Sequence, residues 1–434
     1  MKNSNTSLFR GKNGENYLVP FILITSLFFM WGLANNMTDT LLAAFKRIMS
    51  MTDFQTSLIQ IAFYGSYFCF ALPAALYIRK FSYKSGVLLG LLLYAGGCFL
   101  FYPASVTASY TFYLFAIYVL AGGCSILETS ANPYILTMGS EETATRRLNM
   151  AQSFNPIGSI TGILLSQFFI LAELNSADAA ERAAMTADQL EQVQATELSA
   201  VTMTYVFVGV ALLAIFFVIV LTKMPKGSDS DNTSSLGATF KRLFKNKRYT
   251  FGVIAQFFYV GAQIGVWSYT IRYVMVHLNY NEKDAATIYL ISIIGFSLAR
   301  FVFTALMKYV KPSVLLVIAS IGAIVCSAAT IMCDGMTGVV GLVGISVFMS
   351  LMFPTIYGIA MHRLGDDAKV GGSGLIMAIL GGAALTAIQG MISDWATNAN
   401  LSFVSAGINI AYIVPLCCFA VVAAYGWWSA KFKD

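Results

Sequence analysis

Twelve apolar runs follow one another along this sequence, and they limit the folds that are open to it. A helix that crosses the hydrocarbon core of a bilayer needs about 20 apolar residues, and each run meets this length within the usual error of a residue or two at each end. Charged residues make up 11% of the chain, against roughly 25% in soluble domains. The sequence therefore predicts an all-α integral membrane protein. Its transmembrane helices are expected near residues 18–45, 56–79, 86–103, 110–138, 149–172, 200–222, 249–275, 284–308, 312–332, 336–362, 371–392 and 407–430.

The distribution of lysine and arginine supports twelve spans and predicts their orientation. If the N-terminus is cytoplasmic, 21 of the 27 basic residues fall in cytoplasmic segments and 4 in external ones, while Arg272 and Arg300 lie within helices. Cytoplasmic loops carry such an excess of basic residues. A missed helix would invert every later loop, so the split also tests the number of spans. Both termini are predicted to be cytoplasmic.

The helices are expected to form two six-helix bundles, residues 1–222 and 249–434, joined by a cytoplasmic linker at 223–248. The two halves share a weak similarity, since Asn132-Pro133 in the fourth helix has a counterpart in Phe353-Pro354 in the tenth. Repeated bundles related by a pseudo-twofold axis are typical of transporters that bind a solute near the membrane midplane. The long external segment at 173–199 is expected to be a solvated cap or a short helix.

Charge and cysteine content exclude several other classes of protein. The net charge of +6 follows the predicted topology and does not indicate nucleic-acid binding, and the basic end of the linker is expected to lie against the lipid bilayer. The seven cysteines lack the spacing of a metal site and are expected to pack as small apolar residues. No cofactor and no metal are expected. The polar first seventeen residues argue against a cleavable signal peptide.

Asp39 is one of few ionisable residues expected well inside a span, and it follows Asn35 and Asn36 on the same helical face. The alternative is that the first helix ends near Ala34 and that Asp39 lies in the external loop. The apolar residues 41–45 argue for a longer helix. Because an ionisable residue within a membrane is costly, Asp39 is predicted to be functional.

Glu128 is the second such carboxylate, in the middle of the fourth helix, with Ser125 three residues before it and Asn132 four residues after it. Burial disfavours the charged carboxylate, so such a group can bind a proton at neutral pH. The expected depths of Asp39 and Glu128 differ by roughly 10–15 Å at the helical rise. The two are therefore predicted to be a relay or two separate proton-binding sites rather than one hydrogen-bonded pair.

The two arginines within helices have open roles. Arg272 lies close to the outer end of the seventh helix, where it can be a structural anchor or a substrate contact. Arg300 follows small residues in the eighth helix, and a role in helix packing or gating is favoured over contact with a solute.

Two helices carry stripes of neutral polar residues. The seventh carries Gln256, Tyr259, Gln263 and Trp267 at spacings of three and four residues, and the fifth carries Gln152, Asn155 and Ser159. These spacings place each set on one helical face. Amides pair with hydroxyl groups as donors and as acceptors, and aromatic rings cover apolar ring faces, so the stripes suit an uncharged polyhydroxy solute. The alternative is that the amides join neighbouring helices.

The motifs around these residues resemble the fucose permease group of the major facilitator superfamily, which are bacterial proton-coupled sugar symporters. The similar stretches lie at 28–39, 127–133, 148–155, 255–263 and 267–269, with Phe353-Pro354 and the two residues after it, and they span nearly the whole chain. The resemblance implies the major facilitator fold and the symport of a neutral monosaccharide with protons across the bacterial inner membrane.

The resemblance also implies roles for individual residues. Proton coupling would fall on Asp39, and sugar binding linked to protonation would fall on Glu128. The cavity amides would be Asn36, Gln152, Asn155 and Gln263. The chain departs from the family pattern at Ile78–Lys84, where a loop motif is degenerate, and at Phe353, where a tyrosine is expected.

Phe353 has no hydroxyl group to offer a sugar, so the exact substrate stays open. L-fucose is the first expectation from the resemblance, and glucose, galactose, mannose and N-acetylglucosamine are the alternatives. Sodium coupling and drug/proton antiport on the same fold are the other transport alternatives. A membrane enzyme is not expected, because His277 and His362 fall on opposite sides of the membrane and no nucleophile–base pair is evident. The protein is expected to act as a monomer.

Overall fold

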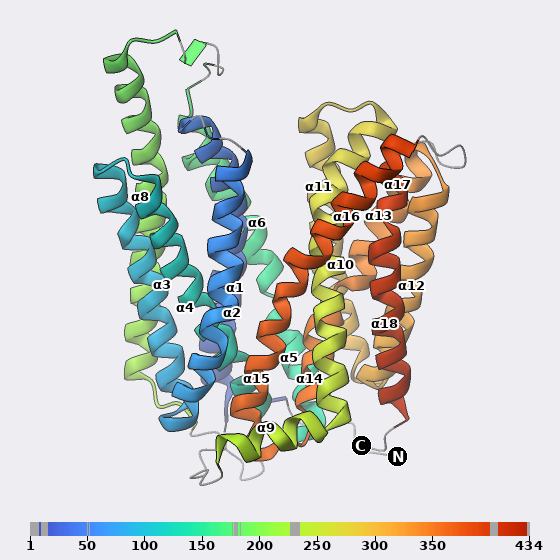
Figure 1. The fold of residues 1–434 in the computed structure, drawn as a ribbon. Coiled ribbons are helices and arrows are strands. Elements are labelled where there is room, and N and C mark those ends of the chain that lie inside the picture. The colour runs from blue at the N-terminus through green and yellow to red at the C-terminus, as the bar shows by residue number, and fades with distance from the viewer. Residues whose placement is uncertain are drawn as a thin grey trace. The chain divides into compact units, whose positions relative to one another are not determined.

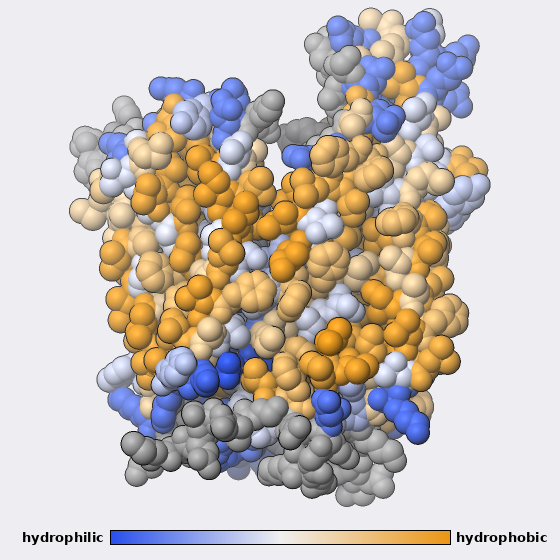
Figure 2. All heavy atoms as spheres, turned by 180° about the vertical axis from the view of Figure 1, so that it is seen from behind, coloured by the Kyte–Doolittle hydropathy of each residue, from blue (hydrophilic) through white to orange (hydrophobic). Residues whose placement is uncertain are grey.

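The computed structural model describes residues 8–9, 16–49, 51, 53–175, 177, 181–182, 184–225, 235–399 and 407–431. Within these ranges, the side chains at 38–43, 46–47, 53–54, 56–57, 171, 282–283 and 398–399 are outside the description. In the described part of the chain, 11 helices are long and apolar enough to cross a membrane. In the view of Figure 2, hydrophobic side chains cover the middle of the protein surface, and hydrophilic side chains gather at its upper and lower ends.

The chain divides into two compact units. The first, here called the N-unit, comprises Val19–Ala131 and Ile157–Gly227, and the second, the C-unit, comprises Met1–Leu18, Asn132–Pro156 and Ser228–Asp434. The helices of the first half of the chain are α1 (Leu18–Ile48), α2 (Asp53–Lys80), α3 (Tyr83–Val106), α4 (Tyr110–Thr137), α5 (Ala144–Gln152), α6 (Asn155–Phe169) and α8 (Ala187–Leu221). The short 3₁₀ turns η1 (Glu141–Thr143) and η2 (Leu171–Glu173) lie between them.

Close backbone contacts hold the N-unit helices together. A side-chain carbon placed on Gly158 would come within 1.9 Å of the carbonyl oxygen of Phe29, so only glycine allows α6 to approach α1 in this way. Small residues play this part in membrane bundles because they let helix backbones approach closely. On the other side of the unit, the rings of Phe101 on α3 and Tyr205 on α8 stack with centroids 4.1 Å apart. The first of these contacts positions α1, which carries Asp39.

The C-unit is built mainly from the second half of the chain. Its helices are α9 (Leu236–Lys245), α10 (Lys247–Leu278), α11 (Glu282–Leu306), α12 (Pro312–Met332), α13 (Gly335–Met349), α14 (Met352–Met361), α15 (Ala368–Met377), α16 (Gly381–Ala399), α17 (Gly407–Ala411) and α18 (Ile413–Ala430), with η3 (Gly365–Asp367) and η4 (Ala378–Leu380). Within this unit α12 packs against α13 and α18, and α10 packs against α16 and α18. The short helix α9 lies across the lower end of α10 (Figure 1).

The predicted helix positions agree closely with the structure, but several predicted single helices are broken. The predicted span at 149–172 is α5 followed by α6, with a turn at Ser153 and Phe154 before Pro156. The span at 336–362 is α13 and α14, with a turn before Pro354. Proline has no N–H to donate and disturbs the preceding turn, which explains both breaks. Because α6 has only 15 residues, the fifth span does not meet the length criterion that the other eleven meet.

The segment at 173–199, which was predicted to be a solvated external cap or a short helix, differs from that prediction at residues 187–199. These residues do not form a separate cap, because α8 is one helix of 35 residues that starts at Ala187. Its start is fixed by Thr186, whose side chain accepts from the Gln189 backbone N–H while the Gln189 side chain accepts from the Thr186 N–H. This capping box satisfies amide groups that the first turn leaves without partners.

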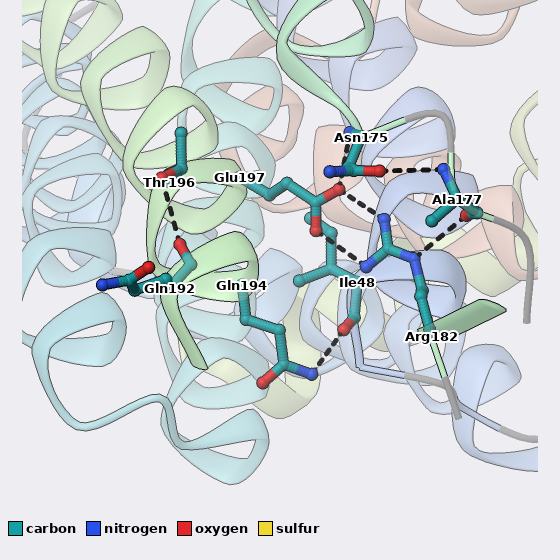
Figure 3. A network of polar contacts seen from close by, with 8 residues as sticks. All are labelled: Ile48, Asn175, Ala177, Arg182, Gln192, Gln194, Thr196 and Glu197. Atoms are coloured by element: carbon teal, nitrogen blue, oxygen red, sulfur yellow. Dashed lines mark hydrogen bonds and ion pairs between the residues drawn. The ribbon is translucent and has the colours of Figure 1, made fainter. Parts of the chain in front are cut away.

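A buried ion pair, which the sequence did not indicate, joins Arg182 to Glu197 of α8 (Figure 3). Arg182 and Glu197 are 2% and 1% exposed, and the Arg182 Nη1 donates to Glu197 Oε2 at 2.9 Å. The same carboxylate accepts from the Asn175 backbone N–H at 2.8 Å. Gln194 Nε2 also donates to the carbonyl oxygen of Ile48 at 2.8 Å and so joins α8 to the last turn of α1.

The predicted linker at 223–248 contains the helix α9. Ser235 caps its start by accepting from the Ala238 N–H at 3.3 Å. Arg242 donates from both Nε and Nη2 to the carboxylate of Asp367, at 2.7 and 2.6 Å. Arg242, one of the basic residues that were expected to lie against lipid, therefore binds a carboxylate of its own chain.

Candidate functional site

Glu128 is buried in the N-unit, as the sequence predicted, with only 2% of its side chain exposed. Tyr67 of α2 and Cys124, one helical turn before Glu128, both lie close enough to interact with its carboxyl group electrostatically. Ser125 Oγ donates to the carbonyl oxygen of Tyr67 at 2.9 Å and fixes α2 beside α4. Ser125, which shares the helical face of Glu128, therefore has a packing role in this structure.

The helix α1 continues to Ile48, so Asp39 lies within it and the alternative of a helix ending near Ala34 is wrong. The Asp39 side chain falls outside the described residues. Asn36 donates from Nδ2 to the carbonyl oxygen of Gly32 at 3.3 Å. The side-chain oxygen of Asn35 is buried and accepts no hydrogen bond from the described part of the chain.

Asn132 and Gln152 form a direct amide pair in the C-unit. Gln152 Nε2 donates to Asn132 Oδ1 at 2.7 Å, and the side chains of Gln152 and Asn132 are 2% and 0% exposed. Asn132 lies one helical turn after Glu128 on the continuous helix α4. Asn155 is the first residue of α6 and is half-buried, directly after the helix break. Two of the predicted site residues are therefore in direct contact, and the amide of Gln152 joins α5 to α4.

The predicted stripe on α10 is divided between packing and available groups. Tyr259 is fully buried and its hydroxyl donates to the Met349 carbonyl oxygen at 3.1 Å. Trp267 Nε1 donates to Ser346 Oγ at 3.3 Å, so both residues join α10 to α13. Gln256 is also fully buried, but neither of its amide atoms has a hydrogen-bond partner among the described residues. Gln263, one turn beyond Tyr259, is half-buried.

Phe353 lies beside this stripe. Its ring is 6% exposed and meets the ring of Tyr259 in a T-shaped contact at 6.3 Å. The ring of Tyr357 stacks near it at 6.5 Å. The rings of Tyr259 and Tyr357 thus flank Phe353, whose own ring carries no hydroxyl group. Arg272, by contrast, is exposed on α10.

Gln389 and Tyr67 were not among the residues predicted from the sequence. Gln389 on α16 is fully buried against Gly265 of α10, and both its amide atoms are without partners in the described structure. A signal for it was present, because Thr386, Gln389 and Ser393 follow one another at spacings of three and four residues. Tyr67 had no comparable signal, since it lies in an aromatic-rich helix where tyrosine usually packs.

The structure groups the predicted residues in two sets. The N-unit holds Asn35, Asn36 and Glu128, together with the backbone of Asp39. The C-unit holds the remaining predicted residues, which are Asn132, Gln152, Asn155, Gln256, Tyr259, Gln263 and Trp267. Of the predicted amides, Asn35 Oδ1 and both amide atoms of Gln256 have no hydrogen-bond partner among the described residues. Such groups bind hydroxyl-bearing molecules without the cost of desolvating a charge.

Comparison with known proteins connects this arrangement to a family. Residues 22–380 match the model of the Major Facilitator Superfamily. The chain is 42% identical to the L-fucose-proton symporter of Haemophilus influenzae over 95% of this chain and 96% of that one. It is 36% identical to the L-fucose-proton symporter of Escherichia coli, over 97% and 94% of the two chains. It is 31% identical to a glucose/galactose transporter of Brucella abortus over 95% and 94%.

The fold leads to the same family. A crystal structure of FucP, a Major Facilitator Superfamily transporter, in the outward conformation matches this structure with a TM-score of 0.88 at 34% identity. The match covers 96% of this chain and 100% of that one. The chain therefore belongs to the major facilitator superfamily of multi-pass membrane transporters, with the twelve-helix fold of that superfamily, and within it to the family that contains the L-fucose-proton symporters.

Proposed function

We propose that this protein is a proton-coupled symporter that carries a neutral monosaccharide, with L-fucose as the first candidate, into a bacterial cell. The observation that carries the proposal is the burial of Glu128, 2% exposed, within a helix of 28 mostly apolar residues. A carboxylate in such surroundings is costly when charged, and protonation removes the cost. The L-fucose-proton symporters to which the chain is 42% and 36% identical support this reading.

Protons are proposed to act at two separate residues. Asp39 would exchange protons with the external solution and couple the gradient to sugar accumulation. Glu128 would bind sugar in its protonated form. A membrane potential of 100 mV supplies about 2.3 kcal/mol for each charge that enters. A tenfold ratio, whether of protonation or of sugar concentration, corresponds to about 1.36 kcal/mol. One proton per cycle therefore supplies enough energy for sugar accumulation of at least tenfold.

The sugar is proposed to bind to neutral amides and aromatic rings. Asn35, Asn36, Asn132, Gln152 and Asn155 would supply hydrogen bonds to its hydroxyl groups from the first half of the chain. Gln256 and Gln263 would contact it from α10, and Gln256 is the stronger candidate because its buried amide lacks a partner among the described residues. Tyr259 and Trp267 would act through their rings, since their polar atoms bind Met349 and Ser346.

The proposed setting is the bacterial inner membrane, with both termini in the cytoplasm and the protein acting as a monomer in lipid. The two halves, 1–222 and 249–434, would rock about the sugar and expose it to each side in turn, as in other transporters built from repeats. The linker at 223–248 would lie on the cytoplasmic side, where the basic face of α9 meets anionic lipid.

Glucose or galactose is the second candidate substrate. Phe353 lacks the hydroxyl group expected at that position, and the chain is 31% and 32% identical to glucose/galactose transporters of Brucella abortus and, putatively, of Helicobacter pylori. A different set of donors at the sugar would change which hydroxyl orientations are accepted.

A sugar panel in proteoliposomes tests the proposal. We expect labelled L-fucose to accumulate when the outside is acidified, and the accumulation to collapse with a protonophore. Stronger uptake of another sugar would correct the substrate. Uptake driven by a sodium gradient, or uptake indifferent to both pH and protonophore, would contradict proton symport, and export of an apolar drug instead would indicate antiport.

A further inference from the structure

Two prolines leave two backbone carbonyl groups without their helical donors. Pro156 is the second residue of α6 and Pro354 is the third residue of α14. In a helix each of these residues would donate its N–H to the carbonyl four residues earlier, at Gln152 and at Ser350, but proline has no N–H. The neighbouring bonds are present, since the Thr355 N–H donates to Leu351 at 3.2 Å and the Ser153 N–H to Asn149 at 3.0 Å.

A single arginine supplies the missing donors at both positions. Arg300 of α11 donates from Nη1 to the Gln152 carbonyl oxygen at 2.9 Å, and from Nε to the Ser350 carbonyl oxygen. The side chain is 3% exposed, and its guanidinium lies 4.5 Å from the centre of the Phe296 ring. The planar guanidinium holds its donors in a fixed fork, so one side chain can reach two carbonyls that lie side by side.

The charge of Arg300 is balanced by dipoles in the described structure. The ion pairs among the described residues involve Arg182, Arg242, His277 and His362, and none includes Arg300. Gln152 is the last residue of α5, and Ser350 directly follows the last residue of α13. The C-terminal end of a helix carries partial negative charge and stabilises a cation. Arg300 therefore caps two helix ends with one charge.

We propose that Arg300 is a positioning residue for transport, which fixes the two helix breaks and thereby orients Gln152 and Asn155. Gln152 carries both the carbonyl that Arg300 holds and the amide that donates to Asn132. Asn155 lies three residues further, at the first residue of α6, so the geometry of the break sets its direction. The assignment of these amides to the sugar rests on the proposed function, but the capping itself does not.

A mutant cycle separates this role from a general need for charge. Pro156→Ala and Pro354→Ala return the two N–H donors, so they should make Arg300 dispensable. We expect Arg300→Gln to lower the unfolding temperature of the purified protein by about 5 °C and to weaken sugar affinity about tenfold. The triple variant with both prolines replaced should recover most of each loss. Arg300→Lys, which cannot reach both carbonyls in a fork, should lie between wild type and Arg300→Gln.

Arg146→Gln is the matched control, because Arg146 Nε also donates to a carbonyl, that of Thr304 at 3.3 Å, which no proline has freed. Its effects should be the same with and without the two proline replacements. If Arg300→Gln is equally harmful in both backgrounds, the capping proposal is wrong. If the unfolding temperature is rescued but Arg300→Gln never changed sugar affinity, the positioning role is wrong. Should Arg300→Gln fail to fold, Arg300→Lys carries the same cycle. The unfolding measurement needs no sugar, so a failure of the proposed substrate does not affect it.

Discussion

The candidate site residues of the two units differ in one respect. The N-unit holds the carboxylate Glu128 and the helix that carries Asp39, in addition to the amides Asn35 and Asn36, whereas the candidate site residues of the C-unit are all neutral amides and aromatic side chains. Only the first kind changes charge with pH in the working range of a cell. Under the proposed function, the comparison predicts that the sugar contacts of the C-unit can be changed without altering proton coupling. The following predictions test that separation.

The largest expected effect is on coupling. Asp39→Asn should abolish proton-driven accumulation and leave some sugar exchange, because the site can still bind but no longer takes up a proton. Glu128→Gln mimics the protonated carboxyl, so its sugar binding should persist at alkaline pH, where that of the wild type declines. Binding at several pH values and counterflow in proteoliposomes measure both effects. Equal and complete loss of binding in both variants would contradict separate roles.

A stability effect in the same unit should leave coupling intact. Arg182→Ala removes one partner of a pair that is 2% and 1% exposed and leaves the Glu197 charge buried. The expected cost is about 3–5 kcal/mol of folding stability. Thermal unfolding in detergent checks this, with Arg182→Met/Glu197→Leu as the control that removes both charges and should be milder. A shift in the pH dependence of uptake would show that the pair takes part in coupling.

Loss of a C-unit amide should change affinity alone. Gln256→Ala is expected to weaken sugar binding by about 1–3 kcal/mol, which is roughly fivefold to 150-fold, because a buried amide that meets the sugar loses its hydrogen bonds. Its pH profile should match the wild type. Gln389→Ala serves as the comparison, since it is also a buried amide without a described partner but was not predicted at the site. If Gln256→Ala alters the pH profile, the separation between the units fails.

The smallest expected effect is on sugar preference. Phe353→Tyr adds one hydroxyl group beside Tyr259 and should change the ratio of affinities for L-fucose and galactose by up to about tenfold, or 1.4 kcal/mol. Competition binding with both sugars measures this ratio. An unchanged ratio would remove Phe353 from the residues that set specificity.

Much of the fold follows from the sequence because apolar length and basic loops are strong signals. Glu128 was identified from the same kind of signal, because a carboxylate within an apolar run is costly and is seldom kept there without a function. Asn132 and Gln152 were each identified as polar residues of consecutive helices, but the hydrogen bond between them was not predicted. Each of these inferences depends on local sequence or on neighbouring elements.

What the sequence did not show depends on contacts between distant elements. Tyr259 shares its helical face with Gln256, yet its hydroxyl binds Met349, which lies 90 residues further along the chain. Similarly, the partners of Arg300 are carbonyls at Gln152 and Ser350, and a backbone acceptor has no signature in a side-chain pattern. Periodicity identifies which face of a helix is polar but not which neighbour uses it.

The bond between Gln194 and the last turn of α1 has a mechanical consequence. It joins Ile48, the last residue of the helix that carries Asp39, to Gln194 of α8, near the Arg182–Glu197 pair. A force that arises when Asp39 gains a proton would then act on both helices together. The helix α1 would then not tilt independently of α8. A tilt of α1 near Ile48 would also move α8, whose other end at Leu221 leads into the linker.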